Sequence, residues 1–184
     1  MVESQSQKQV GRAMNALQDY LISRLLVPKI YLDVLWNGAP VSVLAIDRAG
    51  VGDVHAVWII YLSPGLDTSL ASMALNARLP GTIEEMKLLP AMEEAKSRPT
   101  HFRYVAIVSD NPSVHRFELS DEVIQKSLAD DGVGRVGILH VDLSGLDTSV
   151  RLVLKPERFR SSKEVIEMAD KYVAEHTPNW EIRE

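Results

Sequence analysis

Three apolar runs joined by short glycine-containing turns constrain the fold of this chain most. The runs are Ile30 to Trp36, Val41 to Asp47 and Val54 to Leu62, and they are rich in the β-branched and aromatic residues that favour strands. Asn37-Gly38 joins the first two runs, and the segment Gly50 to Asp53 joins the last two. Both connections tolerate positive φ, as hairpin turns require. The pattern predicts a three-stranded antiparallel meander.

Helical periodicity and further strand-like runs surround this meander. Apolar residues recur every three or four positions from Val10 to Val27, before Pro28, which predicts a helix with one buried stripe. The later elements are expected to be a helix over Thr82 to Lys96, a strand over Phe102 to Ser109, a helix over Asp121 to Ala129, strands over Val136 to Leu143 and Val150 to Leu154, and a C-terminal helix after the capping-box pair Ser161 and Glu164. The order α-βββ-α-β-α-ββ-α predicts an α/β (α+β) fold with a mixed central sheet and helices on both faces.

Composition bounds the organisation and the class of protein. A chain of 184 residues that is 46% hydrophobic is long enough for one well-cored domain, which we expect over residues 10–176, between a flexible start (1–9) and a tail (177–184). The net charge of -5 does not favour a dedicated nucleic-acid binder. The absence of cysteine excludes disulfides, thiolate metal sites and cysteine nucleophiles. No run has the length of a signal-peptide core or a membrane span, so we expect a cytoplasmic protein.

The hairpin of the second and third runs, set between two helices, resembles the core of the PD-(D/E)XK nuclease superfamily. The resemblance covers roughly Val10 to Ser109, with a looser fit to Leu154, and it implies a restriction-endonuclease-like fold. In that family an Asp early in the first strand, and an acid and a Lys two residues apart in the second, hold the metal and the attacking water. Laid on this hairpin, the pattern places Ser42 at the Asp position, Trp58 at the acid and Ile60 at the Lys. The resemblance therefore implies a degenerate active site.

The residues at these three positions cannot perform the chemistry of a metal-dependent nuclease. Side chains two apart on a strand share a face, so Trp58 and Ile60 point the same way as Ala56. An indole and a sec-butyl group cannot ligate Mg²⁺, which takes oxygen ligands, and Ser42 offers one neutral hydroxyl. We expect this face to belong to the core, with no catalytic residue, no metal and no cofactor.

Relocated acids are the alternative, and they would make the protein a divalent-metal nuclease that uses Mg²⁺. The candidates are Asp47 and Asp53, which flank a turn close to His55, and Glu85 on the second helix. Asp is common beside glycine turns because it hydrogen-bonds locally. Glu85 and Lys87 are two apart on a helix and point about 200° away from each other, so they do not recreate the strand geometry.

Positive charge is concentrated late in the chain, around Phe159. The basic residues are Arg151, Lys155, Arg158, Arg160 and Lys163. This segment could contact nucleic-acid phosphates or a carboxylate-rich protein partner. Because Glu157 and Glu164 dilute the charge, binding of nucleic acid without cleavage is possible but not favoured.

The leading interpretation is a catalytically inactive domain that acts by binding, either to itself or to a protein partner. The run Ile30 to Trp36 carries apolar residues on both faces, as an edge strand that pairs across a homodimer would. No feature of the sequence indicates a membrane partner.

Overall fold

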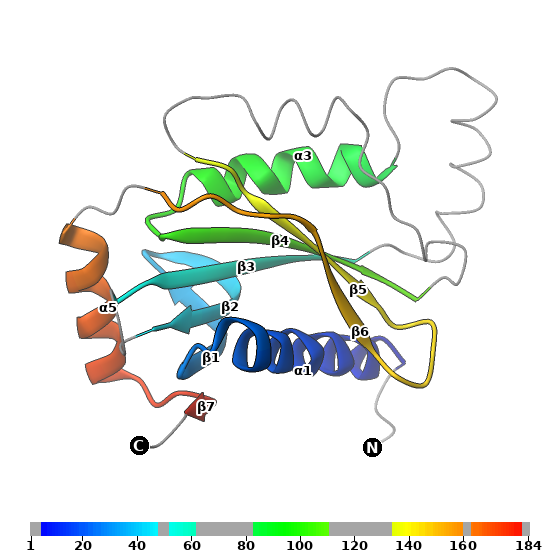
Figure 1. Ribbon diagram of the computed structural model, residues 1–184, viewed down its shortest axis with the longest axis horizontal. Coiled ribbons are helices and arrows are strands. Elements are labelled where there is room, and N and C mark those ends of the chain that lie inside the picture. Colours follow the sequence, from blue (N-terminus) through cyan, green and yellow to red (C-terminus); the bar gives the residue numbers. More distant parts are fainter. Residues whose placement is uncertain (1–4, 48–51, 62–82, 111–133, 160–162, 182–184) are drawn as a thin grey trace.

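The computed structural model describes residues 5–47, 52–61, 83–110, 134–159 and 163–181. Figure 1 shows their elements in order: α1 (Gln5–Leu25), β1 (Lys29–Trp36), β2 (Ala39–Ile46), β3 (Val54–Tyr61), α3 (Ile83–Lys96), β4 (Phe102–Ser109), β5 (Gly137–Asp142), β6 (Ser149–Leu154), α5 (Lys163–Glu175) and β7 (Trp180–Glu181). The helix expected over Asp121 to Ala129 lies outside the described residues. None of the described helices has both the length and the apolar character needed to cross a membrane.

The strands form one seven-stranded mixed sheet in the order β6-β5-β4-β3-β2-β1-β7. β1, β2 and β3 are the expected antiparallel meander, in which Val43 lies opposite Leu32 on one side and Val57 on the other. β3, β4 and β5 are parallel neighbours, and α3 lies in the crossover from β3 to β4, as a parallel pair requires. β6 and β7 pair antiparallel at the two ends of the sheet.

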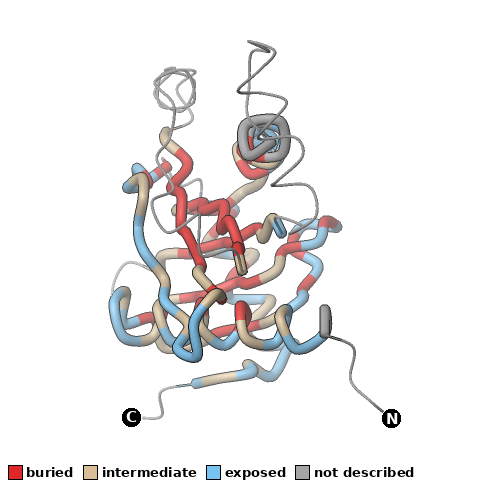
Figure 2. Tube along the Cα trace, turned by 90° about the vertical axis from the view of Figure 1, so that its right-hand side faces the viewer, coloured by how far each residue is buried: buried red, intermediate tan, exposed pale blue. Residues whose placement is uncertain are grey.

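Helices cover both faces of this sheet (Figure 1). α1 packs on one face through the fully buried Ala13, Leu17 and Leu21. α3 and α5 cover the other face, where Leu88 of α3 and Val165 of α5 join the core. Figure 2 shows that buried residues run along the strands between these layers. The predicted α/β fold class, with a mixed sheet and helices on both faces, is confirmed.

The N-terminal helix is longer than its apolar pattern predicts. α1 begins at Gln5, so part of the stretch expected to be flexible is helical. The polar residues of this stretch favour a helix, but they give no apolar periodicity from which the helix could be predicted. The helix ends at Leu25, and Leu26 takes a left-handed φ of 55°, a common helix terminus. Pro28 then follows two residues later, as the sequence predicts.

The C-terminal segment expected to be a tail adds the last strand. In β7, Trp180 pairs with Ile30 and Glu181 with Lys29. The Lys29 ammonium lies 2.6 Å from a Glu181 carboxylate oxygen. A strand of two residues has no periodicity of its own, so only the tertiary structure places it.

Gly137 at the start of β5 is required by close packing. A Cβ added there would lie 2.8 Å from Cδ of Pro156 and 2.9 Å from Cδ1 of Tyr104, and both are parts of rings that cannot swing aside freely. We expect Gly137→Ala to lower the free energy of unfolding by about 1–3 kcal/mol, measured by urea denaturation.

Gly11→Ala is the matched control for this substitution. Gly11 is exposed within α1, with nothing within 4 Å of an added Cβ. The same chemical change should therefore raise the stability by up to about 1 kcal/mol through helix propensity. Equal effects of the two substitutions would contradict the packing argument.

Candidate functional site

The structure places the face of β3 that the nuclease resemblance points to inside the core. Trp58 is 7% exposed, and it belongs to the apolar cluster formed with α3 and α5. Ile60, two residues later, is partly buried against the same cluster. Among the described residues, neither side chain is part of a group that could hold a metal ion.

Ser42 completes the hydrogen bonding of the sheet. Leu32 and Val43 face α1, whereas the next pair, Val34 and Val41, faces α3 and α5. In a regular strand, residues two apart point to the same face of the sheet. The alternation is therefore interrupted at the residues between these pairs, Asp33 and Ser42. Asp33 has a left-handed φ of 50°. At this irregularity the backbone N–H of Ile59 donates to the Ser42 hydroxyl oxygen at 3.3 Å.

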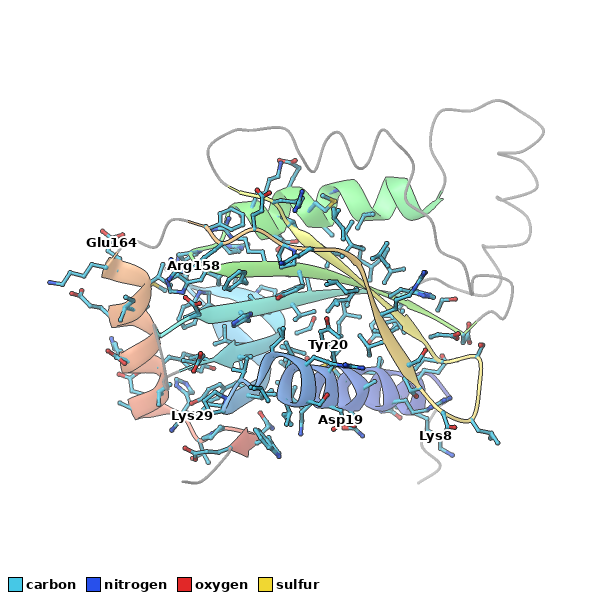
Figure 3. The ribbon with its side chains drawn as sticks, in the orientation of Figure 1. Lys8, Asp19, Tyr20, Lys29, Arg158 and Glu164 are labelled. Atoms are coloured by element: carbon cyan, nitrogen blue, oxygen red, sulfur yellow. The ribbon has the colours of Figure 1, made fainter. Side chains whose placement is uncertain are left out.

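At the start of β3, Asp53 lies in a polar cluster with His101 and Arg158. We call this group the Asp53 cluster. Nε and Nη2 of Arg158 donate to the same Asp53 oxygen at 2.9 and 2.7 Å, and Figure 3 shows Arg158 near the end of the sheet where α5 begins. His101 Nδ1 lies 3.9 Å from that oxygen. The sequence separates Asp53 and Arg158 into two different candidate sites, and the structure joins them.

His101 has a structural role that the sequence does not indicate. The ring nitrogen Nδ1 of His101 accepts a hydrogen bond from the backbone N–H of Val54 at 2.9 Å. The backbone N–H of His101 donates to the carbonyl of Val54, and the backbone carbonyl of His101 accepts the N–H of Phe159. Nδ1 is therefore an acceptor and Nε2 carries the proton of the neutral ring. His101 thus connects β3, β4 and the segment that follows β6.

The other relocated candidates do not assemble around a metal. The backbone N–H of Asp47 donates to the carbonyl of Asp53 at 2.8 Å, which closes the turn, and the side chain of Glu85 lies outside the described residues. Burial lowers the pKa of His55 to about 4, although Asp53 and Asp47 act in the opposite direction. His55 is stacked on Phe102, with ring centroids 4.7 Å apart. Within the described part of the chain, no three His, Asp or Glu residues are grouped to hold a metal ion.

Arg103 is a buried cation that sequence reasoning missed, because it lies within a run of strand-forming residues. It is 6% exposed, and its guanidinium carbon lies 3.2 Å from the centre of the Phe159 ring. Burial lowers the pKa of Arg103 to about 10, so it stays charged at neutral pH. Its N–H groups donate to the Thr100 hydroxyl and to the carbonyl of Arg98, which fixes the connection from α3 to β4.

In the described part of the expected basic segment, two of the cations are paired with carboxylates. Arg158 is bound to Asp53, and Lys163 lies 3.6 Å from Glu167 on α5. Arg160 lies outside the described residues. Arg151 and Lys155 are both exposed, within β6 and directly after it.

The two edges of the sheet differ. At the β1 edge, β7 pairs with the first residues, Asn179 N–H donates to the Ile30 carbonyl, and the Asn179 side-chain oxygen accepts the N–H of Leu32. The left-handed Asp33 follows. Irregular and partly covered edges resist strand pairing, so the geometry does not favour the expected homodimer through β1. At the other edge, β6 has only β5 as a neighbour among the described strands, and Leu152 is 40% exposed.

A shallow groove runs beside the β6 edge, between this strand and α1. It has a volume of about 200 Å³, and it is lined by Asp19, Tyr20, Ser23 and Arg24 of α1 and by Thr148 and Val150. Figure 3 labels Asp19 and Tyr20 on α1. Burial raises the pKa of Tyr20, so its hydroxyl is protonated and can donate a hydrogen bond.

The comparisons with known proteins leave the function open. No protein-family model matches the chain, and no curated protein matches it. Among solved structures the chain is similar to SPO1766, a protein of unknown function from Silicibacter pomeroyi, with 13% sequence identity, a TM-score of 0.49, and coverage of 95% of this chain and 88% of that one. This similarity carries no functional argument.

Substituting Trp58 with glutamate tests whether this position is core or open site. Because Trp58 is 7% exposed among apolar side chains, Trp58→Glu should lower the free energy of unfolding by about 4 kcal/mol or more, measured by urea denaturation. Tyr61→Glu is the control on the same strand, since Tyr61 is 37% exposed and should tolerate the change. A Trp58→Glu protein of unchanged stability would mean that the position faces solvent.

Buried neutral His55 predicts loss of stability in acid. The pKa of His55 falls from 6.5 in the unfolded chain to about 4 in the fold, so the unfolded state binds the proton first as pH drops. The free energy of unfolding should therefore decrease by about 3 kcal/mol as the pH falls from about 7 to about 4. His55→Phe, which keeps a ring against Phe102, should flatten this part of the pH profile in thermal unfolding.

His176→Gln is the control for the pH profile, because His176 is exposed at the end of α5. This variant should retain the acid-dependent loss of stability. If His55→Phe and His176→Gln give the same profile as the unmodified protein, His55 is not responsible for the loss.

Proposed function

We propose that this protein is a catalytically inactive domain of restriction-endonuclease-like architecture that acts by binding another polypeptide. The observation that carries the proposal is the burial of Trp58, and the partial burial of Ile60, beneath α3 and α5. In the nuclease layout that the sequence resembles, these two positions supply the acid and the lysine. A carboxylate and an ammonium would lose hydration at these positions without a compensating partner.

The contacts of the remaining acids support the same proposal. Asp53 accepts two N–H groups of Arg158, and a cation bound to the carboxylate competes with a metal ion for it. His101 uses Nδ1 to accept the Val54 N–H. These groups hold three segments of chain together, which is a structural role.

The distribution of cations supports a protein partner over a nucleic acid. Phosphate recognition depends on several cations that neutralise neighbouring phosphates together. Here Arg158 and Lys163 are each paired with a carboxylate, so these two cations do not form such a group.

A cleavage assay tests the catalytic half of this proposal. The purified protein is incubated with single- and double-stranded DNA and RNA in Mg²⁺ or Mn²⁺, beside a matched sample in chelator. We expect no metal-dependent cleavage, because the described residues hold no group of three metal ligands. Cleavage that survives repurification, disappears in Asp53→Asn and persists in the control Asp19→Asn would overturn the proposal.

A further inference from the structure

We propose that His101 is the pH-sensitive part of a latch that holds one end of a strap against the sheet. The strap is the segment Lys155 to Phe159, which follows β6 and leads towards α5. The latch is closed while the His101 ring is neutral, and acid opens it. This inference goes beyond the proposed binding function and does not depend on it.

Three contacts hold the end of the strap where β3 and β4 begin. The backbone N–H of Phe159 donates to the carbonyl of His101 at 2.8 Å. Nε and Nη2 of Arg158 donate to one carboxylate oxygen of Asp53. The ring of Phe159 lies 3.2 Å from the guanidinium carbon of Arg103. Asp53, His101 and Arg103 therefore decide whether this end of the strap stays attached.

The other end of the strap is held by contacts in which no histidine takes part. The backbone N–H of Glu157 donates to the carbonyl of Arg135 at 2.9 Å, and Nε of Arg135 donates to the carbonyl of Lys155 at 2.8 Å. Both acceptors are backbone carbonyls, which do not titrate. We therefore expect acid to release Arg158 and Phe159 and to leave Glu157 in place.

Only the neutral ring of His101 fits the closed latch. Nδ1 accepts the backbone N–H of Val54 at 2.9 Å, so a proton on Nδ1 would place two donors against each other. The Asp53 oxygen that accepts both N–H groups of Arg158 lies 3.9 Å from Nδ1, and a protonated ring can turn towards it. The proton therefore deprives Val54 of its acceptor and brings a second cation to the oxygen that holds Arg158.

The charges around His101 act in the same direction. The described groups that interact with it electrostatically are Asp53 ahead of β3, His55 of β3, Arg103 of β4 and Arg158 of the strap. With both histidines neutral, this group carries one negative and two positive charges. A proton on the fully buried His101 adds a third cation beside the same carboxylate. Arg158, whose side chain is 38% exposed, is the cation that can move into water, and the end of the strap moves with it.

The burial of the ring sets the pH range of the latch. Burial lowers the pKa of His101 below its ordinary value of 6.5, although Asp53 acts in the opposite direction. When the latch opens, water reaches the ring and the pKa returns towards 6.5. The open state therefore binds the proton first as the pH falls, so the closed latch is fully stable above this value and loses stability below it. Each pH unit below it should raise the open population by up to about tenfold.

Amide hydrogen exchange of the full chain, followed by NMR and corrected for the intrinsic exchange rate, tests the inference. Between about pH 6 and about pH 4.5, the protection of the Val54 and Phe159 amides should fall by up to about tenfold per pH unit. The Glu157 amide, at the other end of the strap, should keep its protection. The amide of Val105, in the middle of β4, reports unfolding of the whole domain and should stay better protected than that of Phe159.

His101→Asn is the variant that isolates the ring proton. The side-chain oxygen of asparagine can replace Nδ1 as the acceptor for Val54, and it does not titrate. The Phe159 amide of this variant should keep the same protection over the whole pH range. His55→Phe and His176→Gln each remove another histidine, and both controls should retain the loss of protection at Phe159.

The protonation state of the His101 ring provides a second measurement if His101→Asn does not fold. In the unmodified protein at neutral pH, the nitrogen chemical shifts should report a bare Nδ1 and a protonated Nε2. A doubly protonated ring in a protein whose Phe159 amide is still protected would overturn the inference. It would also be overturned by an unchanged loss in His101→Asn, or by equal losses at Phe159, Glu157 and Val105, which would mean that the whole domain unfolds.

Discussion

The burial of β3 and β4 on both faces is the constraint on which the rest of this structure depends. α1 covers one face of these strands, and α3 and α5 cover the other. Burying a charged or polar side chain in the middle of either strand costs free energy unless that side chain has compensating contacts. Trp58 and neutral His55 avoid burying a charge, whereas Arg103 is a buried cation whose guanidinium is stacked on Phe159.

Because the middle of the sheet is buried, the polar side chains of the candidate site lie at the end of the sheet. Asp53 and His101 lie where β3 and β4 begin, and Arg158 reaches them from the segment after β6. There the carboxylate has a cation and the imidazole has a backbone donor, so the cluster joins segments rather than exposing reactive groups. At the β1 edge of the sheet, β7 and Asn179 pair with part of the strand.

Sequence reasoning located the elements of the candidate site better than its contacts. It placed Trp58 and Ile60 on one buried face, because alternation along a strand is a local property, and the core confirms this. It separated Asp53 from Arg158, which lie 105 residues apart, because no local pattern links a turn to a segment so distant. It gave no role to His101, since one histidine before a strand carries no signal of its partners.

The antiparallel meander and the apolar faces of its strands could be predicted from the sequence, because they follow from side-chain periodicity and from turn residues such as Asn37-Gly38. The parallel pairing of β3 with β4, the pairing of β7 with β1 and the place of β6 at the other end of the described sheet became clear only from the folded chain. The physical reason is that strand neighbours are chosen by the burial of both sheet faces and by backbone pairing between distant segments. Those energies depend on the whole assembled core and not on any stretch of sequence.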